Sequence, residues 1–421
     1  MGILDAAHRR FGFTLGDLCL LPLAVFLFSL PFSHTVALRL YTLLIALVVA
    51  LVYTARGRGP PSIPLKLPLA LWAGVALASL AWSAMPGYSL REIRNEIGYS
   101  LIAFLVCYTM AANERAWRLY VVALVASFLA VSAVGLHWFA MGYDQITDAP
   151  HGGVGHYSTY LVTILPLLMI VTLDAARHGF PASILRPLLP LLLLVDGYGT
   201  ANRAFWPAVI VSTVVFAFLY ALRAAHFRVR MKVLTVATMV VILAATAFGV
   251  ILQQRATQRS DTVAEALATD PRLPLWPQVF TMIERHPVIG GGFGRGIYGK
   301  ELSELNGTPE LWHGHNMFLN YALQLGIVGV LVLVILLVAI TREFWRLYRA
   351  DDPAASMIGL AGITMLAGFI AKNATDDFFV RQNSLMFWSV VGLSLGYGRW
   401  RMRSAASEAP QGTPRRDGTS A

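Results

Sequence analysis

The chain contains the run Leu319-Asn-Tyr-Ala-Leu-Gln-Leu-Gly-Ile-Val-Gly-Val-Leu-Val-Leu-Val-Ile-Leu-Leu-Val-Ala-Ile340, in which no residue is charged. It is long enough to cross a membrane as a helix, which takes about 20 apolar residues. Of the 421 residues, 57% are hydrophobic and 13% are charged, and the mean hydropathy is +0.61. Soluble domains carry about 25% charged residues. The sequence therefore predicts an all-α polytopic membrane protein without a large extramembrane domain.

Apolar stretches of this kind recur along the chain and predict about 12 transmembrane helices. They lie at 14–31, 35–54, 67–82, 97–112, 117–140, 156–174, 184–200, 205–222, 233–252, 315–340, 354–371 and 380–398. We therefore expect a membrane domain of about nine helices at 1–252, a long loop at 253–314 and three C-terminal transmembrane helices at 315–403. The remainder, 404–421, is rich in Ser, Gly, Pro and Arg and is expected to be a disordered cytoplasmic tail.

Lys and Arg in the short loops fall mostly on one side of the predicted helices, which we assign to the cytoplasm. With an even number of spans, both termini are then cytoplasmic and the loop 253–314 faces the outside. The net charge of +10 follows from this bias, so we do not expect nucleic-acid binding. Cys19 and Cys107 both lie in apolar runs and predict neither a disulfide framework nor a cysteine metal site.

The long outer loop contains signals for two short helices that lie along the membrane interface. Asp261 is a candidate N-cap for a helix over 262–268. Pro277 is a candidate start for a second helix, in which Trp276, Phe280 and Ile283 share one face.

Three arginines lie on the outer side, where membrane insertion does not favour cations. Arg203 ends the turn Gly197-Tyr-Gly-Thr-Ala-Asn-Arg203 between two predicted helices, Arg272 lies in the long loop, and Arg381 begins the last helix. Each alone is equally well explained as an anchor that reaches the lipid headgroups. Three guanidinium groups on one face favour a site for a lipid-linked phosphate or diphosphate, which guanidinium binds bidentately.

The segment Trp312-His313-Gly-His315-Asn316 opens the long apolar run. Helical spacing from His315 predicts a stripe of mostly small residues that lets another helix approach: Leu319, Ala322, Gly326 and Gly329. We expect His315 to point into the bundle and, because a helix N-terminus disfavours imidazolium, to be neutral and able to accept a proton. The alternatives are a histidine that caps the helix or bonds to a backbone carbonyl, and a His-x-His metal site, for which no third ligand has clear spacing.

Two further features accompany these residues on the outer side. Asp376 and Asp377 are candidates to bond to the arginines or to His315, or else are solvated loop acids. The run Gly290-Gly-Gly-Phe-Gly-Arg-Gly296 follows no strand and lacks the Gly-Lys-Ser/Thr ending of a phosphate loop. We interpret this run as a flexible turn that allows a close backbone approach to a ligand.

Taken together, these motifs resemble the C-terminal region of the bacterial O-antigen ligase and polymerase superfamily. The similar stretches are Arg272-Leu-Pro-Leu-Trp276, Ile283-Glu-Arg-His-Pro-Val-Ile-Gly-Gly-Gly-Phe-Gly294, and His315-Asn316 with Gly326-Ile-Val-Gly329. One long outer loop directly before the His-Asn helix is more similar to lipopolysaccharide O-antigen ligases than to polymerases, which usually carry two. The topology resembles the family over the whole chain, and the motifs cover about 203–381.

The resemblance implies roles for individual residues. The family's catalytic histidine corresponds to His315. Its essential arginine in the turn before a span corresponds to Arg203, where Asn202 replaces the more usual Ser, and its loop arginine corresponds to Arg272. Its late acidic residue corresponds to Asp376 or Asp377. We expect supporting roles for the polar residues around them: Asp376, Asp377, Arg381, Asn316 and His313.

The resemblance also implies the reaction and its setting. A completed O-antigen polysaccharide moves from undecaprenyl diphosphate to a sugar hydroxyl of lipid A-core, with inversion, at the periplasmic face of a Gram-negative inner membrane. The implied fold resembles C-type membrane glycosyltransferases, and no metal or other cofactor is implied. The residues suit this chemistry, because His315 is placed to deprotonate the acceptor and the arginines to stabilise the departing diphosphate.

Two classes of alternative remain at this level. An O-antigen polymerase or a protein O-oligosaccharyltransferase of the same superfamily shares the donor but uses another acceptor. A transporter of the lipid-linked glycan explains the arginines as a transit path, although it leaves the outermost position of His315 unexplained and no inverted repeat is apparent.

Overall fold

The computed structural model describes residues 18–408 except 61, 142–149, 176–181, 259–261, 269, 271 and 308–310. All regular structure in these residues is helical. The elements are α3 (Leu21–Ser29), η1 (Ser33–Thr35), α4 (Val36–Tyr53), η2 (Thr54–Arg58), α5 (Lys66–Ala78), η3 (Ser79–Ala81), α6 (Pro86–Glu92), η4 (Ile93–Gly98), α7 (Tyr99–Met110), α8 (Glu114–Ala140), α9 (Val154–Ala175), α10 (Ala182–Gly199), α11 (Phe205–Arg223), α12 (Phe227–Gln258), α13 (Val263–Ala268), α14 (Arg272–Arg285), η5 (Arg295–Ile297), α15 (Gly299–Asn306), α16 (Met317–Tyr348), α17 (Pro353–Asn373) and α18 (Arg381–Glu408).

Each predicted apolar stretch contains one of these helices, in chain order, which confirms the all-α membrane fold. Seven of the described helices are long and apolar enough to span a membrane. Such runs become helices because a bilayer offers no partner for exposed backbone groups, so each N–H and C=O must pair within its own segment.

The core forms where α18 packs along α7, and α17 packs on α16 and α11. Trp388 of α18 is fully buried and stacks on Trp72 of α5, with ring centroids 5.4 Å apart. Close approach depends on small residues, because a Cβ on Gly392 or Gly396 would lie within about 2.5 Å of carbonyl oxygens of α7. Small residues at helix interfaces are typical of membrane bundles.

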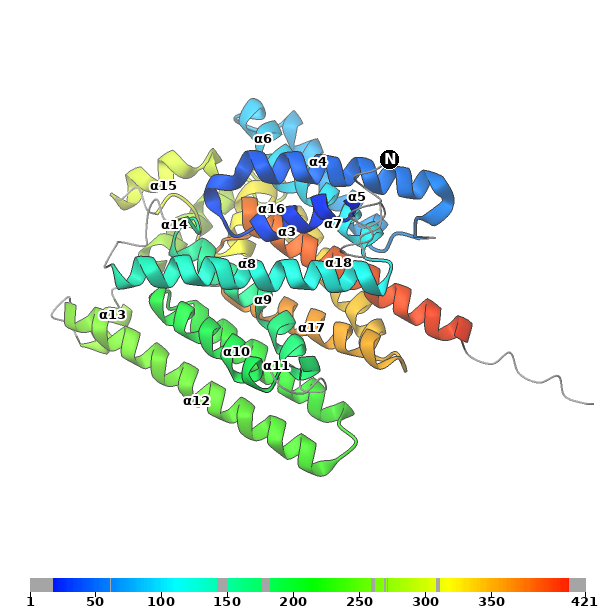
Figure 1. The fold of residues 1–421 in the computed structure, drawn as a ribbon. Helices are drawn as coiled ribbons and strands as arrows, with labels where there is room; N and C mark the ends of the chain where they lie inside the picture. The colour runs from blue at the N-terminus through cyan, green and yellow to red at the C-terminus, as the bar shows by residue number, and fades with distance from the viewer. Residues whose placement is uncertain are drawn as a thin grey trace, which may run out of the picture.

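The outermost helices present aliphatic side chains outward. Helix α12 lies along one edge of the bundle (Figure 1), and only 11% of its most apolar window is buried. Helix α4 lies along another edge and is also largely exposed. These faces suit contact with lipid tails, as expected for a polytopic protein.

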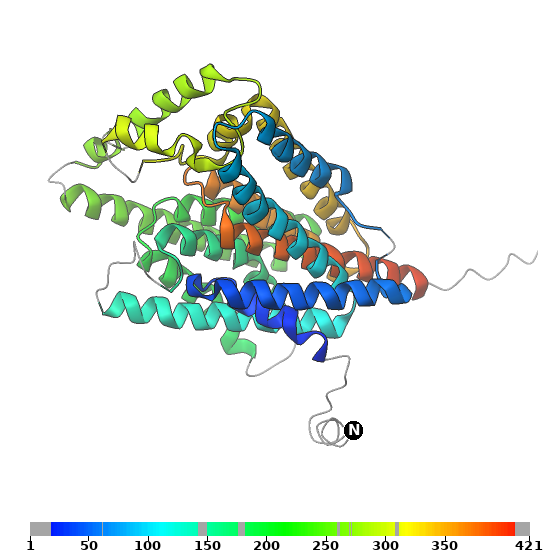
Figure 2. The ribbon, with the colours of Figure 1, turned by 90° about the horizontal axis from the view of Figure 1, so that it is seen from above.

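The three helices of the long loop, α13, α14 and α15, gather at one end of the bundle, where α12 ends (Figure 1). The C-terminal end of α18 lies at the other end, and the view from above agrees (Figure 2). The long loop is thus folded into helices over one end of the membrane domain.

The second helix of the long loop, α14, begins at a different residue from the one that the sequence predicts. Helix α14 begins at Arg272 and contains Pro277 inside it, because Asp270 caps its start: the Asp270 Oδ1 accepts a hydrogen bond from the Arg272 N–H at 3.0 Å. Its buried face consists of Leu275, Val279 and Met282, and the predicted face residue Phe280 is exposed.

Two other boundaries also differ. Asp261, the expected cap of α13, lies outside the described residues, and Thr262 and Glu265 form a reciprocal capping box instead. Helix α18 continues to Glu408, so the first residues of the expected tail are helical; 409–421 lie outside the described residues.

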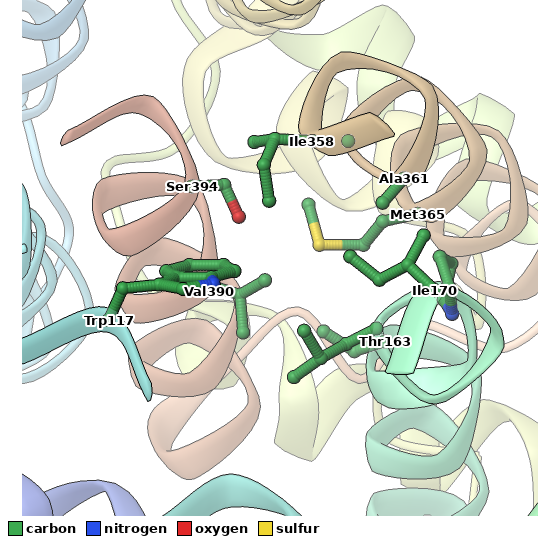
Figure 3. A pocket seen from close by; sticks show the side chains of 11 residues that line it. Trp117, Thr163, Ile170, Ile358, Ala361, Met365, Val390 and Ser394 are labelled. Carbon is green, nitrogen blue, oxygen red and sulfur yellow. The ribbon is translucent and has the colours of Figure 1, made fainter. Parts of the chain in front are cut away.

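A small pocket lies between α8, α9, α17 and α18 (Figure 3). Apolar side chains line most of it, including Trp117, Ile170, Ile358 and Met365. Its cavity volume of about 10 Å³ is near the minimum for one water molecule. This pocket is therefore too small for a glycan or a polyprenyl chain.

Candidate active site

Three loop segments meet at the end of the bundle that carries the long loop, and each contains a strained residue. Ala201, His315 and Arg381 have φ values of 48°, 47° and 46°, and they are three of the four described non-glycine residues with positive φ. Ala201 lies between α10 and α11, His315 lies two residues before α16, and Arg381 begins α18. Such strain persists only where surrounding contacts enforce it, and it concentrates at functional sites.

Asp376 lies at the centre of these segments and is 4% exposed. Its Oδ2 accepts hydrogen bonds from Lys372 Nζ at 2.9 Å and from Asn202 Nδ2 at 3.0 Å. Its Oδ1 lies 3.4 Å from Arg272 Nη2 and 3.5 Å from His315 Nδ1. One carboxylate thus joins α10–α11, α14, α16 and α17.

These neighbours determine the charge of Asp376. Burial alone raises the pKa of a carboxyl group. Lys372, His315 and Arg272 outweigh burial here and hold the pKa of Asp376 well below its usual range. Asp376 is therefore an anion that lies 3.5 Å from the imidazole of His315.

His315 lies just before α16 and not within it, which corrects the predicted helical stripe. The N-cap is Asn316, whose Oδ1 accepts hydrogen bonds from the N–H groups of Phe318 and Leu319 at 2.9 and 3.2 Å. The Asn316 Nδ2 donates to the Ala374 carbonyl at 2.8 Å and so joins α16 to the end of α17. The capping alternative for His315 is therefore wrong, because Asn316 has that role.

His313 packs against His315 and helps to fix its position. The two rings stack with centroids 4.0 Å apart, and the His313 Nδ1 accepts a hydrogen bond from the His315 N–H at 3.1 Å. Burial, with the charges of His315 and Arg295, lowers the pKa of His313 well below its usual range. His313 is thus a neutral, buried partner that holds the backbone of His315 in its strained conformation.

Arg203 and Arg272 are connected through Asp270. The Arg203 Nη2 lies 2.6 Å from Asp270 Oδ2, and the other carboxylate oxygen of Asp270 caps α14 at Arg272. Both arginine side chains remain partly exposed, at 18% and 19%. The guanidinium groups make no further hydrogen bond within the described part of the chain, so a ligand can still use their remaining N–H donors.

Asp377 faces another set of residues, which separates the two adjacent acids. The Asp377 Oδ2 accepts a hydrogen bond from Asn320 Nδ2 at 2.6 Å and lies 3.4 Å from Arg295 Nη1. The same Arg295 nitrogen donates to the Asp377 carbonyl at 2.7 Å, and its guanidinium lies 5.7 Å from the ring centroid of Trp312. Asp376 therefore joins His315, and Asp377 joins Arg295.

The glycine run 290–296 is fixed against α16 and is not a free turn. Helix α16 is broken at Gly326, whose φ of 61° and ψ of −157° are open only to glycine. The N–H groups of Gly291 and Gly292 donate to the carbonyls of Leu323 and Gln324, which the break leaves unpaired. This pairing fixes the start of the segment that carries Arg295.

Sequence reasoning missed several of these residues. Lys372 is fully buried at the outer end of an apolar helix, and its charge within that run is a signal we did not use. Arg295 lies within the glycine run, for which the sequence predicts only a turn, and Asp270 carries no local motif. Among the predicted residues, Arg381 is exposed at the start of α18, and the described residues give it no ion pair.

The described residues contain no group of three or more His, Cys, Asp or Glu side chains that suits a metal ion. The cations near Asp376 are instead Lys372 and Arg272, both within 3.4 Å. The arrangement pairs an imidazole and a carboxylate with neighbouring guanidinium groups. It suits proton transfer next to an anionic leaving group.

Residues 188–334 match the family model described as O-Antigen ligase. This region belongs to the O-antigen ligase family. The search of curated proteins gives no match. The O-antigen ligase match runs from α10 into α16 and contains Arg203, Arg272, His313 and His315, whereas Asp376 lies beyond it.

The family implies a membrane glycosyltransferase of the O-antigen ligase and polymerase type, which acts on lipid-linked glycan in a bilayer. The resemblance noted from the motifs is therefore confirmed at the level of the superfamily.

Proposed function

We propose that this O-antigen ligase family protein transfers a polysaccharide from undecaprenyl diphosphate to a sugar hydroxyl of lipid A-core, with inversion, at the periplasmic face of the inner membrane. The observation that carries the proposal is the His315–Asp376 pair, 3.5 Å apart, with Arg272 also 3.4 Å from the same carboxylate oxygen. A candidate base, His315, and a cation, Arg272, thus both lie next to the same oxygen of Asp376.

In the proposed reaction, the acceptor oxygen attacks the anomeric carbon as the bond from that carbon to the diphosphate oxygen breaks. His315 takes the proton of the acceptor hydroxyl. The anionic Asp376 stabilises the imidazolium that forms, which is a common way to orient and strengthen a histidine base. The electron pair of the broken bond remains on the diphosphate.

Arg203 and Arg272 stabilise the leaving group. Guanidinium offers several N–H donors in a plane and stays protonated, so it binds phosphate oxygens bidentately. Asp270 and Asp376 fix the two arginines before the donor binds, and such preorganised charge is often the largest single contribution to catalysis. The lipid tail of the donor then lies along the membrane-facing surface.

An acceptor-exchange assay tests this function. The purified protein in lipid nanodiscs is incubated with lipid-linked glycan and one of three acceptors: lipid A-core, a second lipid-linked glycan, or a serine- and threonine-containing peptide. We expect glycan on lipid A-core only. Elongation of the lipid-linked glycan would identify a polymerase, and glycosylated peptide would identify a protein oligosaccharyltransferase; either result would contradict the ligase assignment. No transfer to any acceptor would contradict glycosyl transfer.

A further inference from the structure

A π-helical turn that carries Glu96 lies near Asp377 and Arg295. The chain between α6 and α7 forms the π-helical segment η4, Ile93–Gly98. Insertions of this kind cost backbone pairing and are frequent at functional sites, because they redirect a side chain. Glu96 lies on this turn, and its carbonyl accepts a hydrogen bond from Ser384 Oγ of α18 at 3.4 Å.

The carboxyl group of Glu96 has no partner in the described residues, neither a hydrogen bond nor an ion pair. Its side chain is nevertheless only partly exposed. Acids that leave bulk water are normally paired, because an unpaired polar group loses its hydration without compensation. A partly buried carboxyl without a protein partner is therefore suited to a ligand group that donates or accepts a hydrogen bond.

The charges around Glu96 are mixed. Arg295 and Arg381 favour its ionised form, whereas Glu92 and Asp377 oppose it. Burial is the largest influence and raises the pKa of Glu96 to about 8. Near neutral pH much of this carboxyl is protonated, so it can donate one hydrogen bond and accept another, which matches the two-way hydrogen bonding of a sugar hydroxyl.

Arg295 connects α6, the helix directly before this turn, to Asp377. The Gly296 N–H donates to Tyr88 Oη of α6 at 2.9 Å, and a Cβ on Gly294 would lie 2.6 Å from the Tyr88 ring. The segment that carries Arg295 therefore lies directly against α6. Its guanidinium reaches Asp377, the neighbour of Asp376 in the chain.

The polar residues thus fall into two groups around the two adjacent acids. Arg203, Asp270 and Arg272 are connected to one another and to Asp376, and they are assigned to the diphosphate. Arg295 and Glu96 lie near Asp377. In a transfer with inversion, the attacking hydroxyl and the leaving diphosphate lie on opposite sides of the anomeric carbon. The acceptor therefore needs a site separate from the diphosphate site, and the group around Arg295 and Glu96 supplies one.

We propose that Glu96 and Arg295 form the subsite for the acceptor sugar, with the Glu96 carboxyl hydrogen-bonded to a sugar hydroxyl. This inference rests on the proposed function. Glu96 binds the acceptor and positions its ring, and His315 removes the proton from the attacking oxygen.

The test is a kinetic comparison of Glu96→Ala, Glu96→Gln and Glu96→Asp in nanodiscs, with donor and acceptor varied separately. Losing one hydrogen bond to the acceptor should raise its KM about tenfold in Glu96→Ala. We expect an unchanged KM for the lipid-linked donor and a smaller rise in Glu96→Gln, which keeps the shape and hydrogen bonding of a protonated carboxyl. Glu304→Ala is the matched control on the exposed face of α15 and should leave both KM values unchanged.

The outcomes separate this inference from the proposed function. If the wild-type protein transfers glycan to lipid A-core but all three Glu96 variants keep its acceptor KM, the subsite is wrong and the function stands. A rise in donor KM of equal size would also overturn the subsite. If Glu96→Ala does not fold, Glu96→Asp decides, because its carboxyl is set back by one methylene and should raise the acceptor KM. Absence of transfer by the wild type contradicts the proposed function itself.

Discussion

At the scale of single residues, the candidate site is organised around one carboxylate that contacts several partners. Asp376 contacts Lys372 and Asn202 with one oxygen and faces His315 and Arg272 with the other. The buried Lys372 offsets much of the cost of placing an anion in the protein. The other carboxylate oxygen of Asp376 is therefore available to orient the imidazole of His315 and the guanidinium of Arg272.

We predict that His315→Ala folds and inserts but is nearly inactive. A general base contributes about 10²–10⁴-fold in rate, and His315 makes no cap whose loss would unfold α16. Asn316→Ala is the contrasting variant, because losing the N-cap should cost about 1 kcal/mol of stability. Turnover and thermal melting are measured in the same nanodiscs. A folded His315→Ala protein that retains more than about a tenth of the wild-type rate would exclude the base role.

Replacing the arginines by lysine tests the diphosphate site. Arg203→Lys and Arg272→Lys keep the positive charge but lose the planar pair of donors, so we expect transfer to fall about tenfold or more in each. Donor affinity, measured with undecaprenyl diphosphate, should weaken together with the rate. Arg285→Lys is the control, since Arg285 pairs with Glu301 on the exposed side of the loop. Normal donor affinity in both site variants would remove the proposed role.

At the scale of helices, the sequence predicts that a helix forms much better than it predicts where the helix ends or what it contacts. Every long apolar stretch contains a helix, because the bilayer leaves no other way to pair the backbone. The start of α14 was misplaced because the Asp270 cap competes with the local signal of Pro277. The glycine run was misread because its partners, the carbonyls of Leu323 and Gln324, are about 30 residues away in the sequence.

In the candidate site, too, the sequence predicts some residues but not the contacts between them. Arg203, Arg272 and His315 were predictable because each departs from the composition of its surroundings. Their neighbours Lys372 and Arg295 depend on how α17 and the glycine run pack, which no local pattern determines. A charged residue at the end of an apolar helix was the one available signal for Lys372.

Gly326→Ala should disrupt the break in α16. Its backbone conformation is restricted to glycine, and a Cβ there would lie 2.3 Å from the Val288 carbonyl. We expect a loss of at least about 2 kcal/mol of stability, together with lower transfer because the segment before Arg295 shifts. Gly74→Ala in α5 is the control: no atom lies within 4 Å of its Cβ position, so alanine should be neutral or slightly stabilising. Equal melting temperatures for Gly326→Ala and the wild type would show that the break in α16 is not needed to hold the glycine run 290–296 against this helix.

At the scale of the whole molecule, the two ends of the bundle differ in how they use charge. At the end that holds the C-terminus of α18, Arg346 and Arg399 pair with Glu343, and Arg401 pairs with Asp352. At the other end lie the helices of the long loop (Figure 1), and Arg272 of α14 lies 3.4 Å from Asp376. The positive-inside rule assigns the first end to the cytoplasm, so we propose that the end with the His315–Asp376 pair faces the periplasm.

Cysteine labelling tests this orientation. In a Cys19→Ser background, where the remaining Cys107 is fully buried, Glu304→Cys places a thiol on α15 and Asp351→Cys places one between α16 and α17, both at exposed positions. A membrane-impermeant maleimide should label the first variant in intact spheroplasts and the second only after lysis. Labelling in the reverse order would show that every span has the opposite orientation to the one assigned. It would also put His315 on the cytoplasmic side, away from a periplasmic acceptor, so the same experiment that tests the topology tests whether the proposed reaction has access to its substrate.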